Sequence, residues 1–258
     1  MLHLHPHSPL EESTSRNRLI DELPPEERAT VLARLERVSV RADQSLTCQG
    51  SPTDAVYFPE SALVAVEVDG DDVTIVGRHG MLGLAPVLGA ELAPFTSVVL
   101  VPGIVLRATA DTITEAMHEL PAFRALMHRH LGARLVDLAR SGACARVHAL
   151  PARLATLLLT VREESGSDSL PLTHERIAKL IGSTRRASVT DILSVWGERG
   201  IVMRRRGTIA VSDVDGLRTV ACPCAARTLP LHDEAAVPVG VGAPMAAVME
   251  TMGASEHA

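Results

Sequence analysis

The 258-residue sequence is poor in aromatic residues and in cysteine, and each shortage excludes a class of protein. Aromatic side chains make up 2% of the chain, which argues against carbohydrate-stacking modules and single-strand nucleic-acid platforms, because both need aromatic faces. Four cysteines are too few for a disulfide framework. The apolar runs are far shorter than the ~20 residues that cross a bilayer, so we expect no membrane partner.

Signals for secretion, metal binding and catalysis are also missing. The start of the chain lacks the basic and then apolar pattern of a signal peptide, and we expect a cytoplasmic protein. Cys222 and Cys224 are too closely spaced for the usual zinc pair, and no second pair with zinc-finger spacing accompanies them. We interpret them as tail thiols without a sensing role, interpret Cys144 as a packing residue, and expect no metal and no cofactor. No nucleophile elbow, P-loop or dinucleotide loop occurs, so we do not expect an enzyme.

Positive charge is absent from one segment and concentrated in another. Residues 43–77 contain seven acids and no Lys or Arg. Residues 173–207 contain eight Lys and Arg residues and only three acids, although the whole chain has a net charge of −6. A basic segment within an acidic chain is typical of a module that binds a polyanion.

The period of the apolar residues changes near residue 111. Residues 38–110 predict several short strands joined by Gly and Pro turns, with residues 69–72 as a hairpin turn, and thus a small barrel or sandwich. Pro121 then opens a long helix whose apolar and small residues step by four and three. This seam favours a homodimer interface over packing within the same chain. Its residues are Leu131, Leu135, Leu138, Gly142 and Ala145.

The pattern from residue 172 to residue 196 predicts a helix-turn-helix. Thr173 is a good N-cap for a first helix, and Gly182 ends that helix where a left-handed conformation is easiest. Ser183 and Thr184 cap a second helix with a polar start. The residues expected to face inward are Ile177, Leu180, Ile181, Val189, Ile192, Leu193 and Trp196. A helix, a short Gly turn and a polar-headed helix make this motif.

Two short β runs around an Arg-Gly turn follow the second helix and predict a wing with a basic tip. Such a tip suits a phosphate backbone. The second helix of this motif presents its N-terminal residues to base edges, so we predict that the module binds double-stranded DNA. The predicted contact residues are Thr173, Ser183, Thr184, Arg185, Arg186, Ser188, Thr190, Arg204, Arg205 and Arg206. The alternative is a dimeric sensor or adaptor whose winged helix binds a protein partner.

Residues 172–211 resemble the winged helix-turn-helix of the Crp/Fnr family of bacterial transcription regulators, and the upstream order of elements fits as well. The resemblance implies an α+β fold with an N-terminal β-roll (cyclic-nucleotide-binding-like), a long dimerisation helix and a C-terminal winged helix-turn-helix. It also implies a dimeric, DNA-binding transcription regulator, with RNA polymerase as a further partner. The expected divisions are a disordered N-terminus (1–20), a sensor (21–120), the dimerisation helix (121–147), the DNA-binding domain (148–222) and a flexible tail (223–258).

The sensor departs from the cyclic-nucleotide-binding members of that family. Those members carry a Gly-Glu pair for the ribose and an Arg-Ser pair for the phosphate. Here Leu84 stands near the expected Glu and Thr96 near the expected Arg. A buried phosphate without a cation would be strongly unfavourable. We therefore expect no cyclic AMP binding, and the effector is unknown.

Overall fold

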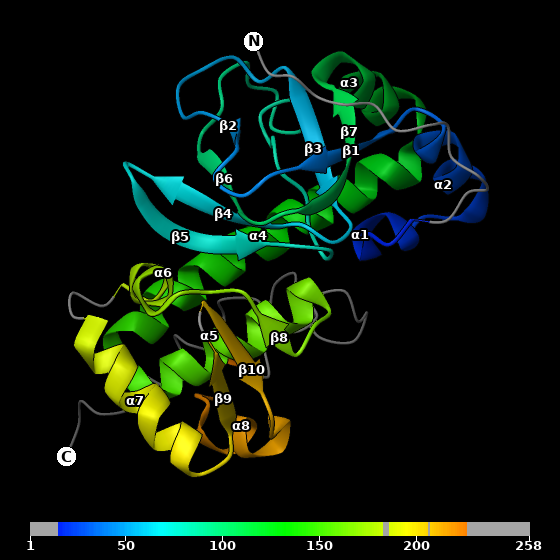
Figure 1. The fold of residues 1–258 in the computed structure, drawn as a ribbon. Coiled ribbons are helices and arrows are strands. Elements are labelled where there is room, and N and C mark those ends of the chain that lie inside the picture. Colours follow the sequence, from blue (N-terminus) through cyan, green and yellow to red (C-terminus); the bar gives the residue numbers. More distant parts are fainter. Residues whose placement is uncertain (1–14, 183–185, 206, 226–258) are drawn as a thin grey trace, which may run out of the picture.

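The computed structural model describes residues 15–182, 186–205 and 207–225. A β-rich N-terminal part, a long helix and a smaller C-terminal part follow one another along the chain (Figure 1). Two short helices, α1 (Arg18–Asp21) and α2 (Pro25–Leu32), precede the first strand. The disorder expected for residues 1–20 does not extend to Asn17, Leu19 and Ile20, which are fully buried. The Asn17 side chain caps α1 and donates to the carbonyl oxygens of Pro59 and Gly80, which anchors this segment to the β-roll.

The N-terminal part contains two antiparallel sheets, as expected for a β-roll. One has the order β1-β7-β3 and the other the order β2-β6-β4-β5. Their strands are β1 (Glu36–Val40), β2 (Ser45–Thr47), β3 (Ala55–Pro59), β4 (Leu63–Val68), β5 (Asp71–Val76), β6 (Thr96–Val101) and β7 (Gly103–Thr109). The buried core around the roll is aliphatic apart from Tyr57, Phe58 and Phe123, in keeping with the low aromatic content.

The hairpin between β4 and β5 is tighter than the sequence predicted. Only Asp69 and Gly70 form the turn, with φ values of 51° and 88°. Two consecutive positive φ values give a backbone twist that matches the twist of the flanking strands. The other two residues of the predicted turn belong to β5, where Asp71 pairs with Val68 and Asp72 with Glu67. This register places two acids opposite each other at the tip of the hairpin.

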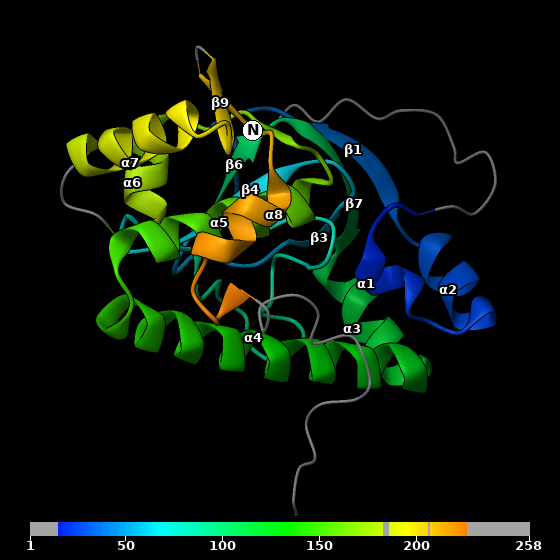
Figure 2. The ribbon, with the colours of Figure 1, turned by 90° about the horizontal axis from the view of Figure 1, so that it is seen from below.

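Helix α3 (Ala110–Glu119) leads into α4 (Pro121–Val147), which lies along one side of the molecule (Figure 2). The first turns of α4 pack on the β-roll through Phe123, Leu126 and Met127, all of which are buried. The Glu27 carboxylate accepts hydrogen bonds from the backbone N–H groups of Ala122 and Phe123, at 3.1 and 2.8 Å. Glu27 thus satisfies donors at the helix start that no side chain of α4 caps.

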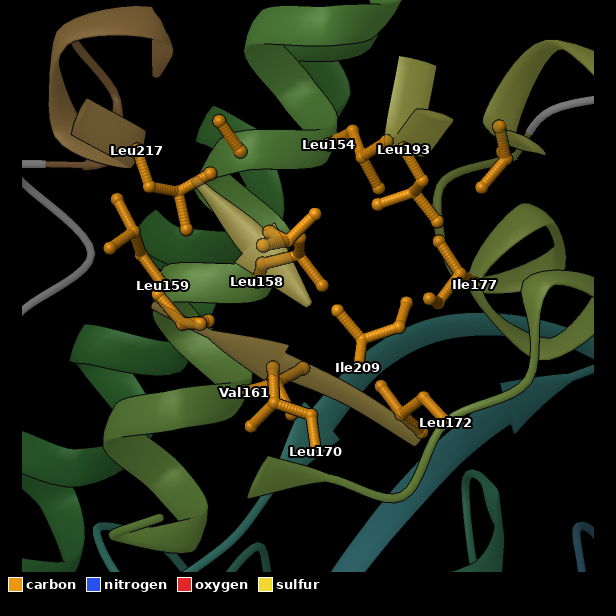
Figure 3. Close-up of a cluster of buried hydrophobic side chains, with 14 of the residues drawn as sticks. Leu154, Leu158, Leu159, Val161, Leu170, Leu172, Ile177, Leu193, Ile209 and Leu217 are labelled. Atoms are coloured by element: carbon orange, nitrogen blue, oxygen red, sulfur yellow. The ribbon is translucent and has the colours of Figure 1, made fainter. Parts of the chain in front are cut away.

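The C-terminal part is built around an apolar core to which Leu63 and Ile75 of the β-roll also contribute (Figure 3). Its elements are α5 (Leu150–Ser165), β8 (Ser169–Leu170), α6 (His174–Leu180), α7 (Arg186–Glu198), β9 (Val202–Arg205), β10 (Thr208–Val211) and α8 (Val214–Val220). Side chains from several of these elements meet around Leu158, including Ile177 of α6, Leu193 of α7 and Ile209 of β10. This core fixes the two helices of the predicted motif relative to the β8-β10-β9 sheet.

A buried carboxylate joins the two parts. Glu164, near the end of α5, accepts hydrogen bonds from the N–H groups of Gly77 and His79, at 3.0 and 3.2 Å. Burial opposes ionisation of this group, but its interactions with His79 hold the pKa of Glu164 below the usual value. A Cβ at Gly77 would lie 2.5 Å from the Glu164 carbonyl oxygen, so only glycine fits this contact. The β-roll and the C-terminal part are therefore packed closely at this point.

Candidate DNA-binding site and sensor pocket

The first helix of the motif forms for the local reasons that the sequence indicated. The Thr173 hydroxyl accepts the Arg176 N–H at 3.1 Å and caps α6. Ile177 and Ala178 are buried against the core. Gly182 has a φ of 63°, and its N–H donates to the Lys179 carbonyl, so the helix ends in the left-handed conformation that favours glycine.

The second helix, α7, begins at Arg186 and packs on α6 through its apolar face. Val189, Leu193 and Trp196 are buried, as predicted. Ser183, Thr184, Arg185, Arg206 and the Arg186 side chain lie outside the described residues. Ser188 is half-buried, and so is Thr190, whose hydroxyl lies 2.9 Å from His174 Nδ1. Thr190 is therefore less available to a ligand than its expected position on the outer face suggested.

The predicted wing is present as the β9–β10 hairpin. Arg205 pairs with Thr208 across the turn, and Gly207 has a φ of 72°. Arg204 and Arg205 are exposed. The Arg204 guanidinium donates to Ser194 Oγ at 2.8 Å, which holds this arginine beside α7. The wing thus places positive charge next to the second helix.

Two basic residues of α6 are bound by acids of the sensor hairpin, which lies next to α6 (Figure 1). Arg176 Nη2 lies 3.0 Å from Asp72 Oδ1 and 3.3 Å from Glu67 Oε1. Lys179 Nζ lies 3.2 Å from Glu67 Oε1 and 3.6 Å from Asp72 Oδ1. We name these four side chains the hairpin–α6 ion cluster. The acidic and basic segments of the sequence therefore meet, although no local sequence signal predicts this contact.

The two acids of the hairpin–α6 ion cluster respond differently to their surroundings. Burial raises the pKa of Asp72, although Arg176 and Lys179 both act against this shift. Burial also acts to raise the pKa of Glu67, but the hydrogen bond from Lys179 and the nearby charges outweigh it and lower that pKa. The Asp72 side chain is fully buried, so its ionised form depends on the two cations of α6.

A pocket opens in the sensor between the β-roll and α4. Its walls are mostly apolar, and its polar groups include Ser97, Arg134 and Asp137. Leu84 lines it, as expected for the position near the missing Glu. Thr96, which we expected near the missing Arg, is not among the lining residues. Its hydroxyl accepts the Gln49 N–H at 3.0 Å outside the pocket, because alternate residues of β6 point to opposite faces.

The cation of the pocket already has a partner. Arg134 Nη2 donates to Asp137 Oδ2 at 2.9 Å, one turn along α4. Burial raises the pKa of Asp137, although Arg134 acts against this shift. The pair leaves no net positive charge on this wall of the pocket while Asp137 is ionised, so an incoming phosphate would compete with a carboxylate.

The second half of α4 exposes the apolar seam predicted for a dimer. Leu135 is 69% exposed and Leu138 is 36% exposed. Gly142 and Ala145 are exposed as well. Leu131 packs partly buried against the β-roll core, and Leu138 also lines the sensor pocket. The seam is therefore a surface that one copy of the chain leaves uncovered, and it adjoins the pocket.

Three cysteines and a histidine come together where α4, α5 and α8 meet. Their ligating atoms, in Cys144, His148, Cys222 and Cys224, all lie within 4.8 Å of one another. The interpretation of Cys222 as a tail thiol is wrong, because it is 3% exposed and its N–H donates to the Ala152 carbonyl. Cys144 is not only a packing residue, since its Sγ contacts Cys222 and His148. A separation of 78 residues between Cys144 and Cys222 hid this cluster from spacing rules.

Two family models match the chain, one in each part of the structure. Residues 37–119 match the cyclic nucleotide-binding domain, and residues 152–220 match the Crp-like helix-turn-helix domain. The chain belongs to the Crp/Fnr family. A β-rich cyclic nucleotide-binding domain, a long helix and a helix-turn-helix domain make up its fold, which confirms the expected α+β class. This Crp/Fnr protein is a DNA-binding transcription regulator, and the alternative of a protein-binding winged helix is not favoured.

Solved structures share this Crp/Fnr fold at low sequence identity. FixK2 from Bradyrhizobium japonicum is 15% identical with a TM-score of 0.62, and the match covers 73% of this chain and 98% of FixK2. The CRP-family transcriptional regulator TTHB099 from Thermus thermophilus is 20% identical with a TM-score of 0.59, covering 71% and 95%. The CRP/FNR-family regulator TTHA1359 from the same organism is 24% identical with a TM-score of 0.56, covering 72% and 98%.

Two further findings bear on the comparison. No curated protein matched this sequence. Within the described part of the chain, none of the helices combines the length and the apolar character that crossing a membrane requires.

Proposed function

We propose that this regulator acts in the cytoplasm as a homodimer that pairs through α4 and reads a two-part DNA operator. The observation that carries the proposal is the apolar seam of α4, which one copy leaves exposed directly between a sensor and a winged helix-turn-helix. Pairing along α4 would bury this seam and present two copies of α7 to DNA. Two-fold symmetry of the protein then requires two symmetric half-sites about one helical turn, or a multiple of it, apart.

In this proposal, the start of α7 reads bases and the wing holds the phosphate backbone. Helix α7 begins at Arg186. Arg185 and Arg186 therefore belong to the N-terminal start of the second helix, which is the part that enters the major groove in this motif. Arg204 and Arg205 are exposed on the wing and carry charge that phosphates would neutralise. The motif would be positioned on the DNA phosphate backbone by Thr173, Ser183 and Thr184. Further contacts would come from Ser188 and Thr190, which follow along α7. RNA polymerase is proposed as the protein partner that responds to the regulator when it is bound to its operator.

The direct test is selection of bound sequences from random double-stranded DNA by the full chain. We expect an enriched motif with two inverted half-sites and a steep loss of affinity as salt rises, since phosphate contacts release counterions. A motif without two-fold symmetry would contradict the dimeric arrangement. An absence of any enriched motif, with binding that is insensitive to salt, would contradict the reading of an operator altogether.

The sensor pocket suggests that the effector is not a classical cyclic nucleotide. Isothermal titration of the full chain with cyclic AMP is expected to show no micromolar binding. The physical reason is the absence of a free cation among the described lining residues: Arg134 is paired with Asp137, and neither Leu84 nor Ser97 carries charge. The Asp137→Asn variant removes the charged partner of Arg134, so it tests whether this ion pair is what prevents cyclic AMP binding. Micromolar affinity of the wild-type chain would overturn this prediction.

The hairpin–α6 ion cluster predicts that the sensor restrains the DNA-binding module. Replacing Glu67 with Gln and Asp72 with Asn together is expected to raise affinity for an operator and to steepen its salt dependence by up to about two, because Arg176 and Lys179 then lose both acidic partners and become free to meet phosphates. Asp71→Asn is the matched control, since Asp71 is an exposed acid one residue earlier in the same strand. Fluorescence anisotropy with labelled DNA over a salt series measures both quantities. Equal affinities of the two variants would contradict the restraint.

A further inference from the structure

The cluster formed by Cys144, His148, Cys222 and Cys224 has no role in DNA reading or in the sensor pocket. Cys144 lies in the last turn of α4, and His148 is the residue that ends this helix. Cys222 and Cys224 follow α8, after the wing. The four side chains therefore converge from the joint between α4 and α5 and from the end of the DNA-binding domain.

Three distances within this Cys3His cluster match those of a tetrahedral metal site. Sγ of Cys144 lies 3.5 Å from Sγ of Cys222 and 3.4 Å from Nδ1 of His148, and Sγ of Cys224 lies 3.7 Å from the same nitrogen. Four ligands bound at ~2.0–2.3 Å to one ion in tetrahedral geometry are separated by roughly 3.3–3.8 Å. These three distances therefore already match one tetrahedral ion, and all four ligating atoms lie within 4.8 Å of one another.

The chemistry of the ligands selects the class of ion. Three thiols and an imidazole favour a borderline-soft, four-coordinate ion such as Zn²⁺ over Mg²⁺ or Ca²⁺, which prefer oxygen ligands. An iron–sulfur cluster distributes its cysteines over several iron atoms and needs them farther apart than the 4.8 Å within which all four ligating atoms lie. A single ion is therefore the better fit.

Neighbouring groups hold the ligands in place. Thr156 Oγ1 lies 3.0 Å from Sγ of Cys222, and the Cys222 N–H donates to the Ala152 carbonyl at 3.2 Å. The His148 N–H donates to the Cys144 carbonyl at 3.0 Å, so both α4 ligands share one helix turn. A hydroxyl against a thiolate sulfur and a fixed backbone are features that orient metal ligands in proteins.

We propose that Cys144, His148, Cys222 and Cys224 bind one Zn²⁺ ion, which ties the end of α4 to the end of the DNA-binding domain. Binding displaces the thiol protons to solvent and leaves three thiolates and a neutral imidazole on the metal. Because His148 is part of the link between α4 and α5, the bound ion fixes the angle between the dimerisation helix and the helix-turn-helix. Metal occupancy therefore controls the orientation of the DNA-binding domain relative to α4.

The test measures metal binding by the full chain purified without an affinity tag. After chelation and reduction, Co²⁺ is added, and the absorption bands of tetrahedral Co²⁺ with thiolate ligands are recorded. These thiolate bands separate the proposed site from His3, His5 and His7 near the start of the sequence, since imidazole ligands cannot produce them. Displacement by one equivalent of Zn²⁺ then gives stoichiometry and relative affinity. We expect one ion per chain.

Matched variants decide which residues bind. Cys222→Ser is expected to weaken Zn²⁺ binding by at least ~100-fold and Thr156→Ala by ~10-fold, since even residues behind the ligands typically contribute 10–100-fold. Cys48→Ser is the control, because Cys48 is exposed and stands apart from the cluster. Absence of thiolate–Co²⁺ bands in the reduced wild-type chain would overturn the proposal. So would equal binding by Cys222→Ser and Cys48→Ser, or a Cys144–Cys222 disulfide as the stable form in the presence of Zn²⁺ and air.

Discussion

Leu135→Glu is expected to convert the regulator to a monomer and to abolish operator binding. Leu135 is the most exposed leucine of the apolar seam on α4, and two-fold pairing would bury it in both copies at once. A buried charge without a partner costs about 3–5 kcal/mol, which corresponds to a loss of dimer affinity of roughly a hundredfold or more. A monomer also presents only one recognition helix and loses the contacts of the second half-site.

Sedimentation and DNA binding at the same protein concentration test this expectation. Arg129→Glu is the control, because Arg129 is exposed on the same helix but about 120° around its axis from Leu135. Leu135 is preferred to Leu138 as the test position, since Leu138 also lines the sensor pocket and its loss would mix two effects. A dimer mass that Leu135→Glu leaves unchanged would remove the α4 seam from the interface.

Replacing Arg185 and Arg186 together with Ala is expected to abolish preference at one or two operator positions. Arginine at the start of a recognition helix can pair with both acceptors of guanine, and each such pair contributes about 1–3 kcal/mol of discrimination. The double variant should therefore lose roughly 10-fold or more in affinity for its operator while retaining most of its affinity for unrelated DNA.

The Arg205→Ala variant on the wing is expected to behave differently from the Arg185 and Arg186 double variant. Arg205 is exposed on the wing, and its loss should weaken binding to all sequences about equally and flatten the salt slope by about one. Competition binding with single-base operator variants distinguishes the two patterns. Intact site preference in the Arg185 and Arg186 double variant would move base reading to Ser188, because the Thr190 hydroxyl is already in contact with His174.

The elements of the DNA-binding domain were predictable because local interactions define them. The Thr173 cap, the left-handed Gly182 and the β9–β10 hairpin of the wing each depend on residues close together in the chain, and all three are present in the structure. The seam of α4 was predictable for a similar reason, since helical periodicity shows which residues share one face. These patterns need no knowledge of the rest of the chain.

The tertiary structure alone decided which distant segments meet. Arg176 lies 109 residues from Glu67, and Cys144 lies 78 residues from Cys222, so neither the hairpin–α6 ion cluster nor the Cys3His cluster has a local signature. Composition had separated the acidic and basic segments, but their pairing depends on how the β-roll packs against α5 and α6. Spacing rules for metal ligands could not bring Cys144, His148, Cys222 and Cys224 together for the same reason, because their closeness in space arises only when the chain is folded.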